Sequence, residues 1–207
     1  MKILIIEASY PKDFYKDQLD GHVTRALTRL LGVQSDLLYA LDKPHFEKAI
    51  AHAAKGDYDV VHISCHGDEI GIAVTNNKPI NWPEFVGLFC KHNCNPRALV
   101  MSSCCGATDE LANEFEKVPN GPYIIFGSID ERNYNEYAVA WTILYNLFKT
   151  KGVHRDVAME ALRAIKAVAH NNFRYLRWKD NKKKYVQYPP EGRRYVVMEK
   201  PKKAKAA

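Results

Sequence analysis

The sequence predicts an α/β fold, a three-layer α/β/α sandwich around a mostly parallel sheet. Short apolar runs rich in β-branched residues alternate with segments of helical spacing, the pattern of parallel strands linked by helices. The 207 residues, 46% of them hydrophobic, suffice for the core of one compact domain. No run of about 18 apolar residues occurs, so we expect no membrane-spanning helix and no membrane association.

The predicted strands and helices follow one another in nearly regular alternation. Buried strands are expected at residues 2–9, 34–40, 59–67, 97–104 and 123–129. Helices, most of them flanked by Gly, Pro or Asn, are expected at 20–32, 44–56, 82–92, 109–117, 135–152 and 155–173. Residues 71–81 interrupt the alternation with two short runs around Asn76 and Asn77, which predicts a small hairpin.

Charge divides the chain unevenly. Residues 1–170 carry 18 Lys+Arg against 21 Asp+Glu, whereas residues 171–207 carry 12 against 3. We therefore distinguish a domain at 1–170 from a basic, aromatic extension at 171–207, which is expected to pack on the domain and to be disordered at its end. Within the extension, "KKYVQYP" and "RRYVVME" predict a terminal strand or hairpin. Its aromatic residues, interleaved with Lys and Arg, also suit nucleic acid, which is the lesser alternative.

The five cysteines do not form the pattern of a disulfide framework, because they are odd in number and fall in the middle of the chain. Reduced thiols, and an N-terminal apolar run too short for a signal peptide, predict a cytoplasmic protein. Cys90, His92 and Cys94 include residue types that bind zinc, but a fourth ligand at fitting spacing is missing. Core packing is the favoured explanation, and neither a metal nor an organic cofactor is expected.

Two chemically active side chains fall at the ends of predicted strands. In "VVHISCHG" a buried strand ends in His66 and Gly67, and in "ALVMSSCCGA" another ends near Cys104. Catalytic groups gather at the carboxyl ends of parallel strands, so the imidazole and the thiol are expected close together. They have the parts needed for nucleophilic catalysis, and a sharp turn at Gly106 would let backbone amides line an oxyanion site.

Three segments, in this order, resemble the caspase-like (clan CD) cysteine peptidases, the group that includes caspases, metacaspases, separase and CHAT-domain proteases. "SCHGDEIGIAVTNNKPINWPEF" (64–85) resembles the His-Gly motif with its acidic loop, hairpin and helix. "PRALVMSSCCG" (96–106) resembles the strand that ends in the nucleophile. "YIIFGSIDERNYNEYAVAWTILYNLF" (123–148) is similar to the CHAT segment in which a strand, a serine and a variable loop lead into a long helix. The match spans residues 1–150 and implies a caspase-like sheet.

The resemblance implies a cysteine endopeptidase with a dyad of Cys104 and His66. Cys104 is expected to be the nucleophile and His66 the general base or acid, with the backbone amides of Gly67 and Cys104 holding the oxyanion. Cys105 stays open as an alternative nucleophile, because a shift of one residue in the alignment would select it. The spacing to the flanking proline and glycine favours Cys104.

Substrate contacts are expected from two segments. Ser102 stands two residues before the nucleophile, where caspases have the Gln that reads an acidic substrate side chain, so cleavage after Asp is not supported. In the resembling families the loop after Ser128 helps to line the pocket for the residue before the scissile bond. Here Asp130 and Glu131 in that loop favour a substrate Arg or Lys. Arg132 in the same loop could instead receive an acid, and that alternative stays open.

The resemblance also implies a protein or peptide substrate, and regulation by an activator or a larger assembly, as in a defence or cell-death pathway. The short span from Cys104 to the strand at 123 leaves little room for a cleavable linker, so maturation into two chains is not expected. The alternative from another class is a caspase-fold binding module without turnover, which would bind a peptide, a nucleotide or a nucleic acid.

Overall fold

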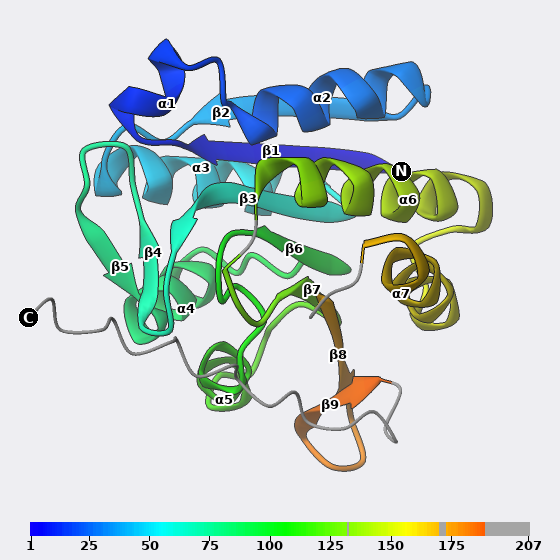
Figure 1. The fold of residues 1–207 in the computed structure, drawn as a ribbon. Coiled ribbons are helices and arrows are strands. Elements are labelled where there is room, and N and C mark those ends of the chain that lie inside the picture. Colours follow the sequence, from blue (N-terminus) through cyan, green and yellow to red (C-terminus); the bar gives the residue numbers. More distant parts are fainter. Residues whose placement is uncertain (132, 170–172, 189–207) are drawn as a thin grey trace, which may run out of the picture.

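A sheet with helices on both faces forms the body of the molecule (Figure 1). The computed structural model describes residues 1–131, 133–169 and 173–188. The strands are β1 (Lys2–Ala8), β2 (Gln34–Tyr39), β3 (Val60–Gly67), β4 (Gly71–Ala73), β5 (Pro79–Asn81), β6 (Ala98–Ser102), β7 (Ile124–Ser128), β8 (Phe173–Lys179) and β9 (Lys184–Tyr188). The helices are α1 (Pro11–Tyr15), α2 (Asp20–Leu30), α3 (Lys43–Lys55), α4 (Trp82–Lys91), α5 (Asp109–Glu116), α6 (Tyr134–Lys151) and α7 (Arg155–Ala169).

The sheet runs in the order β2-β1-β3-β6-β7-β8-β9. The first five of these strands are mutually parallel, whereas β8 and β9 are antiparallel to their neighbours. β4 and β5 form an antiparallel hairpin that is joined to the end of β3. The carboxyl ends of β1, β3, β6 and β7 therefore meet at one edge of the sheet, the edge where ligands bind in open α/β folds.

Apolar side chains cover both faces of the sheet. Because successive residues of a strand point to opposite faces, Leu4 and Ile6 of β1 join one core, while Ile3 and Ile5 join the other. The first core is closed by α3, α4 and α5, and the second by α6 and α7, with α2 packed beside α6 (Figure 1). This arrangement confirms the predicted three-layer sandwich. Among the described helices, none is both long and apolar enough to cross a membrane.

The five predicted strands, the hairpin at 71–81 and the starts of the six predicted helices are confirmed. Two elements were not predicted, the five-residue α1 and the strand β8. The helix expected at 155–173 was too long, because α7 ends at Ala169 within the described residues and Phe173 already belongs to β8. Phe173 pairs with Ser128 of β7 and is fully buried, so sheet pairing overrides the local helical pattern there.

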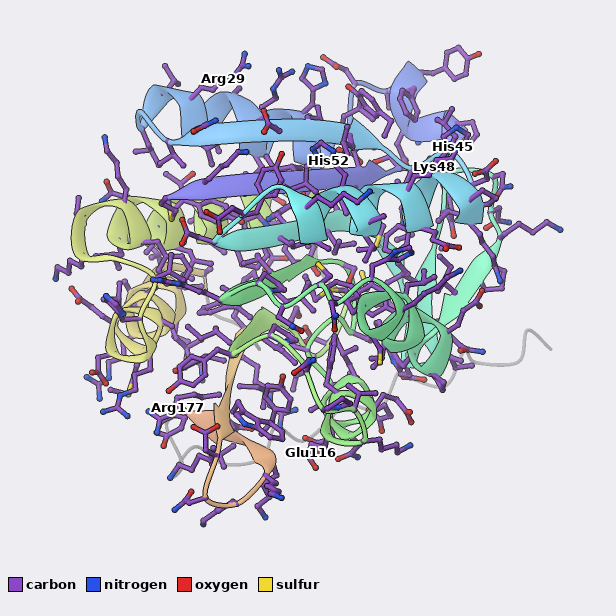
Figure 2. The ribbon with its side chains drawn as sticks, turned by 180° about the vertical axis from the view of Figure 1, so that it is seen from behind. Arg29, His45, Lys48, His52, Glu116 and Arg177 are labelled. Atoms are coloured by element: carbon purple, nitrogen blue, oxygen red, sulfur yellow. The ribbon has the colours of Figure 1, made fainter. Side chains whose placement is uncertain are left out.

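The described part of the basic extension adds to the sheet. β9 falls in "KKYVQYP" and pairs with β8, and the backbone N–H of Tyr185 donates to Glu116 of α5 at 2.6 Å. Figure 2 shows Glu116 and Arg177 of β8 at this lower edge of the molecule. "RRYVVME" and the end expected to be disordered lie outside the described residues. The boundary between residues 170 and 171 stays a prediction.

Candidate active site

His66 and Cys104 emerge from neighbouring parallel strands at the same level. β3 and β6 are in register such that Ser64 pairs with Ser102. His66 and Cys104 each follow that pair by two residues, and adjacent strands lie about 4.8 Å apart. The register therefore places His66 and the turn that holds Cys104 at the carboxyl ends of neighbouring strands.

The His66 ring is held from three sides. Its Nε2 lies 2.7 Å from Oδ2 of Asp13 and 3.2 Å from the hydroxyl of Tyr134, and the ring of Tyr10 stacks on it with 4.0 Å between centroids. The His66 side chain is 30% exposed, whereas that of Asp13 is only 4% exposed. A buried carboxylate at Nε2 favours the tautomer with the proton on that nitrogen, which leaves Nδ1 to accept a proton from a reacting group.

Asp13 is a candidate functional residue that was not predicted from the sequence. It lies on the short helix α1, which begins with Pro11 at its first position, soon after β1 ends. Its Oδ2 also accepts the backbone N–H of Tyr10 at 3.0 Å, which fixes the carboxylate in place. The available signal was an acid just beyond the end of the first strand. Its partner His66 lies 53 residues further along the chain, so no local pattern links them.

Cys104 lies in a tight turn that follows β6. The carbonyl oxygen of Ser103 accepts the N–H of Gly106 at 3.2 Å across the turn, and Cys105 has a φ of 55°, in the left-handed region. Gly106 has no space for a side chain, since a Cβ on it would lie 2.6 Å from Cβ of Met101. The small residues of "SSCCG" thus permit the turn that presents Cys104.

Backbone hydrogen bonds fix this turn to the end of β7. The N–H of Cys105 donates to the carbonyl oxygen of Asp130 at 3.2 Å, and the N–H of Ala107 donates to that of Ser128 at 2.9 Å. From β8, the buried Arg174 donates to the carbonyl oxygen of Ala107 at 3.2 Å and to the carboxylate that begins α5 at 2.6 Å. The start of the basic extension therefore supports the turn of the predicted nucleophile.

Gly67, a predicted oxyanion residue, touches this turn. A Cβ on Gly67 would lie 2.7 Å from the carbonyl oxygen of Cys104 and 3.2 Å from Cβ of Ser103. Such contacts are too short for any side chain, so only glycine lets the end of β3 meet the turn backbone to backbone. The structure thus brings Gly67 and Cys104 together.

Of the three thiols near the strand ends, Cys104 is the accessible one. Cys105 is 7% exposed and Cys65 is 8% exposed, whereas Cys104 is half-buried. Burial raises the pKa of Cys105 to about 12, and it raises the pKa of Cys65 well above its usual range. Both thiols stay protonated at neutral pH, and because the thiolate is the attacking form they are poor nucleophiles. This contrast supports Cys104 over Cys105.

The predicted substrate contacts divide into enclosed and accessible residues. Ser102 is 3% exposed and donates its hydroxyl to Asp20 at 2.6 Å, and Ser128 is 0% exposed and donates to Oδ1 of Asp130 at 2.8 Å. These two serines support the site from inside, so we revise the expectation that their side chains contact substrate. Asp130 is half-buried and Glu131 is exposed, in the loop that adjoins the Cys104 turn.

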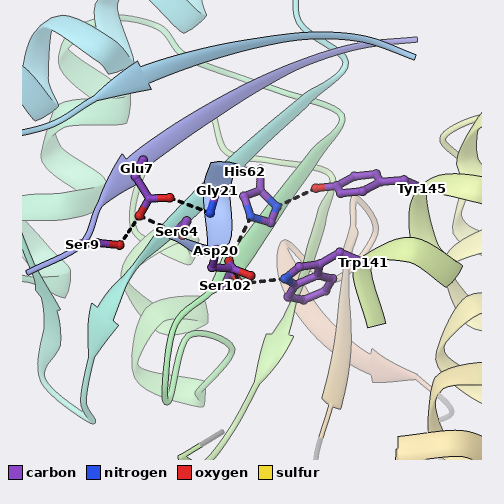
Figure 3. A network of polar contacts seen from close by, with 9 residues as sticks. All are labelled: Glu7, Ser9, Asp20, Gly21, His62, Ser64, Ser102, Trp141 and Tyr145. Carbon is purple, nitrogen blue, oxygen red and sulfur yellow. Dashed lines mark hydrogen bonds and ion pairs between the residues drawn. The ribbon is translucent and has the colours of Figure 1, made fainter. Parts of the chain in front are cut away.

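A buried polar network lies beneath the strand ends (Figure 3). The carboxylate of Asp20, at the start of α2, accepts the Ser102 hydroxyl and lies 3.8 Å from Nε2 of His62. Ser102 Oγ in turn accepts the indole N–H of Trp141 at 2.7 Å, and Nδ1 of His62 lies 2.7 Å from the Tyr145 hydroxyl. These contacts connect α2, β3, β6 and α6, and a buried network of this kind stiffens the elements that carry the site.

Glu7, near the end of β1, lies in the same network. It accepts the N–H of Gly21 at 2.6 Å and the hydroxyls of Ser9 and Ser64 (Figure 3). Burial raises the pKa of Glu7 to about 7, and the neighbouring Asp20 carboxylate acts in the same direction. The carboxyl therefore favours its protonated form in the folded protein at mildly acidic pH.

Glu7 is expected to make the protein less stable as the pH rises. Its pKa is about 7 in the folded state against an ordinary value of 4.5, so the folded state binds more protons between these values. The free energy of unfolding should therefore fall between pH 4.5 and 7, by about 3 kcal/mol from this group. Urea unfolding of the wild type and of Glu7→Gln at pH 5 and 8 measures it. The variant should lose most of that dependence, whereas parallel curves for both proteins would contradict the assignment.

Cys90, His92 and Cys94, the residues considered for zinc, do not form a metal site. Cys90 is exposed and Cys94 is buried, and His92 is hydrogen-bonded to a glutamate of α3. In the part of the chain that the structure describes, no group of three or more His, Cys, Asp or Glu side chains could hold a metal ion. His45 and His52 lie along α3 in the view from behind (Figure 2).

The fold is similar to those of solved protein structures. No protein-family model and no curated protein sequence matches the chain. Among solved structures, the complex of RgpB pro- and mature domains from Porphyromonas gingivalis matches with a TM-score of 0.53 at 14% identity over 81% of this chain. Iotapain, a secreted C11 cysteine protease from Bacteroides thetaiotaomicron, matches with a TM-score of 0.58 at 7% identity over 85% of this chain. Caspase-1 from Spodoptera frugiperda matches with a TM-score of 0.51 at 15% identity over 81% of this chain.

The chain has a caspase-like α/β fold, as the sequence resemblance predicted. It spans 43% of the RgpB chain, 65% of the C11 protease chain and 77% of the caspase-1 chain. At these identities the likeness concerns the fold, and the chemistry has to be inferred from the side chains at the carboxyl edge of the sheet.

Proposed function

We propose that the protein is a caspase-like cysteine endopeptidase, with Cys104 as the nucleophile and His66 as the general base and acid. One observation carries the proposal. An accessible thiol and an imidazole bound to a carboxylate follow the same register pair of neighbouring parallel strands. The burial of the two adjacent thiols supports Cys104, and a structural neighbour that is named a cysteine protease supports the class of chemistry.

In the proposed reaction, the Sγ proton of Cys104 passes to Nδ1 of His66, while the proton on Nε2 stays hydrogen-bonded to Asp13. The thiolate attacks the substrate carbonyl carbon, and the backbone N–H groups of Gly67 and Cys104 stabilise the resulting oxyanion. Collapse of this intermediate expels the amine, which takes the proton from His66, and leaves an acyl-enzyme. A water molecule then loses a proton to His66 and attacks the thioester, which releases the carboxylic acid and the thiol.

Acidic groups near the nucleophile support a preference for cleavage after Arg or Lys. Glu69, Asp130 and Glu131 lie close enough to Cys105 for their negative charges to raise the pKa of its thiol, in addition to the effect of burial. A cationic substrate side chain is attracted to such a site, and an Asp side chain is repelled. Arg132, on which the alternative of an acidic substrate depends, lies outside the described residues.

Activation by a separate partner or signal, in a regulated pathway such as defence or cell death, belongs to the same proposal. It is supported by a structural neighbour that is a complex of pro- and mature domains. If such a partner is needed, adding it should raise the rate of peptide cleavage by this chain without changing which bond is cut.

The proposal is tested with internally quenched peptides that differ only in one residue, Arg, Lys or Asp, before a single cleavable bond. We expect cleavage after Arg and Lys with a kcat/KM at least about tenfold above that for Asp. Mass spectrometry of the products identifies the bond, and Cys104→Ala serves as the blank. If no peptide is cut and no thiol-directed peptide labels Cys104, a caspase-fold binding module without turnover is the better description.

Gly67→Ala is expected to lower kcat/KM for the Arg peptide by about 10–100-fold, because the added methyl group pushes the β3 end away from the Cys104 turn and misplaces the reacting groups. Gly87→Ala is the matched control, since a Cβ on Gly87 of α4 meets no atom within 4 Å. That control should keep wild-type activity. Steady-state kinetics of both variants measures the effect, and wild-type activity in Gly67→Ala would contradict the close contact.

A further inference from the structure

A cavity lies against His66. It has a volume of about 710 Å³ and is lined by the β4–β5 hairpin, by Tyr10, and by Lys43 and Glu84 at the starts of α3 and α4. His66 and Gly67 form part of its wall, whereas Cys104 does not. The cavity therefore adjoins the proposed dyad on the imidazole side.

The proton transfer in the proposed reaction indicates which part of a substrate would lie in this cavity. The imidazole of His66 must give its proton to the nitrogen of the leaving amine, so that nitrogen lies within hydrogen-bond reach of the ring. The residue that carries this nitrogen is the first one after the scissile bond. Its side chain consequently projects from the His66 side of the site, where the cavity opens.

The wall of the cavity is suited to an apolar side chain. Ile70, Ala73 and Pro79 are accessible residues of the wall, and Ile70 is 71% exposed. The charged groups in the wall already have partners. Nζ of Lys43 lies 2.9 Å from Oε1 of Glu84, and the carboxylate at residue 68 accepts the N–H groups of residues 70 and 71 at 2.8 and 3.0 Å. With these groups engaged, the side chains of Ile70, Ala73 and Pro79 offer an apolar surface to a ligand. The nearby carboxylate at residue 68 disfavours an acid there.

We propose that this cavity is the subsite for the first residue after the scissile bond, and that it selects a large apolar or aromatic side chain such as Leu or Phe. The inference rests on the proposed peptidase function and adds to it. Recognition of a substrate then needs a basic residue before the bond and an apolar residue after it. The β4–β5 hairpin, which follows the His-Gly sequence directly, determines the second requirement.

The test uses quenched peptides with Arg before the bond and Leu, Phe, Gly or Asp after it. For the wild type, kcat/KM for Leu or Phe should exceed that for Asp by at least about tenfold. In Ile70→Glu this ratio should fall toward one. Val168→Glu, a change at a 62% exposed site on α7, is the matched control and should keep the wild-type ratio. Equal rates for all four peptides in the wild type would overturn the subsite while leaving the peptidase in place.

A binding measurement on Cys104→Ala separates failure of the subsite from failure of the proposed function. Fluorescence anisotropy with the same peptides should give a dissociation constant for Leu or Phe at least about fivefold below that for Asp, and Ile70→Glu should abolish the difference. Selective binding without any cleavage by the wild type would support the subsite and overturn the peptidase. Absence of both selective binding and selective cleavage would overturn the subsite.

Discussion

Replacing Cys104 with alanine is expected to lower kcat/KM for the Arg peptide by at least about 1,000-fold, because no other thiol at the strand ends can take over. Burial keeps the thiols of Cys65 and Cys105 protonated. The change should leave the fold intact, since Cys104 is only half-buried and alanine fits the same turn. Steady-state kinetics, together with the thermal midpoint of unfolding, measures both effects.

Cys105→Ala is the matched control for this prediction. Cys105 lies in the left-handed region with a φ of 55°, and since alanine also has a Cβ the backbone cost is unchanged. Activity should stay within about threefold of the wild type, because only a buried thiol is removed. The reverse result, an inactive Cys105→Ala and an active Cys104→Ala, would move the nucleophile by one residue and contradict the assignment.

Changes to the imidazole and its carboxylate are expected to have the next largest effects. His66→Gln should lower kcat/KM by at least about 1,000-fold, because glutamine can neither accept the thiol proton nor return it to the leaving amine.

Asp13→Asn should lower kcat by about 100-fold with little change in KM. The asparagine amide can place an N–H donor where Nε2 of His66 now lies 2.7 Å from a carboxylate oxygen. The variant therefore favours the tautomer with the proton on Nδ1, which cannot accept the proton of the thiol.

Asp17→Asn is the control for Asp13→Asn. Asp17 follows α1, is exposed and has a φ of 53°, a conformation that asparagine adopts as readily as aspartate. It should keep wild-type kinetics. If Asp13→Asn is equally harmless, the carboxylate only supports the fold of α1. If Asp13→Asn lowers kcat but also lowers the thermal midpoint strongly, Asp13→Glu distinguishes the roles, since a retained carboxylate should restore part of kcat.

Most of the fold could be predicted because its elements are defined by local patterns. The buried strands β1, β3, β6 and β7 are continuous apolar runs, and the alternation with helices defines their parallel order. β8 was not predicted, because Arg174 and Arg177 interrupt its apolar residues. The structure explains Arg174, which is buried because it bonds to the Cys104 turn and to α5. α1 was missed because five residues carry too little periodicity.

The candidate site was predictable only in part. His66, Gly67 and Cys104 fall at strand ends in recognisable motifs, and sheet register brings them to one edge. Asp13 was missed because it meets His66 only through the packing of α1. Ser102 was expected to contact substrate, but its hydroxyl lies in the buried network beneath the site. The sequence did not indicate which side of the strand its side chain occupies.

The most direct measurement is labelling of the protein with two peptidyl acyloxymethyl ketones, one ending in Arg and one ending in Asp, followed by mass mapping of the modified residue. We expect that Cys104 alone is modified, that the Arg probe reacts faster, and that His66→Ala abolishes the reaction. Modification of Cys105, or labelling of the exposed Cys90 as fast as of Cys104, would show that the fold does not activate the Cys104 thiol.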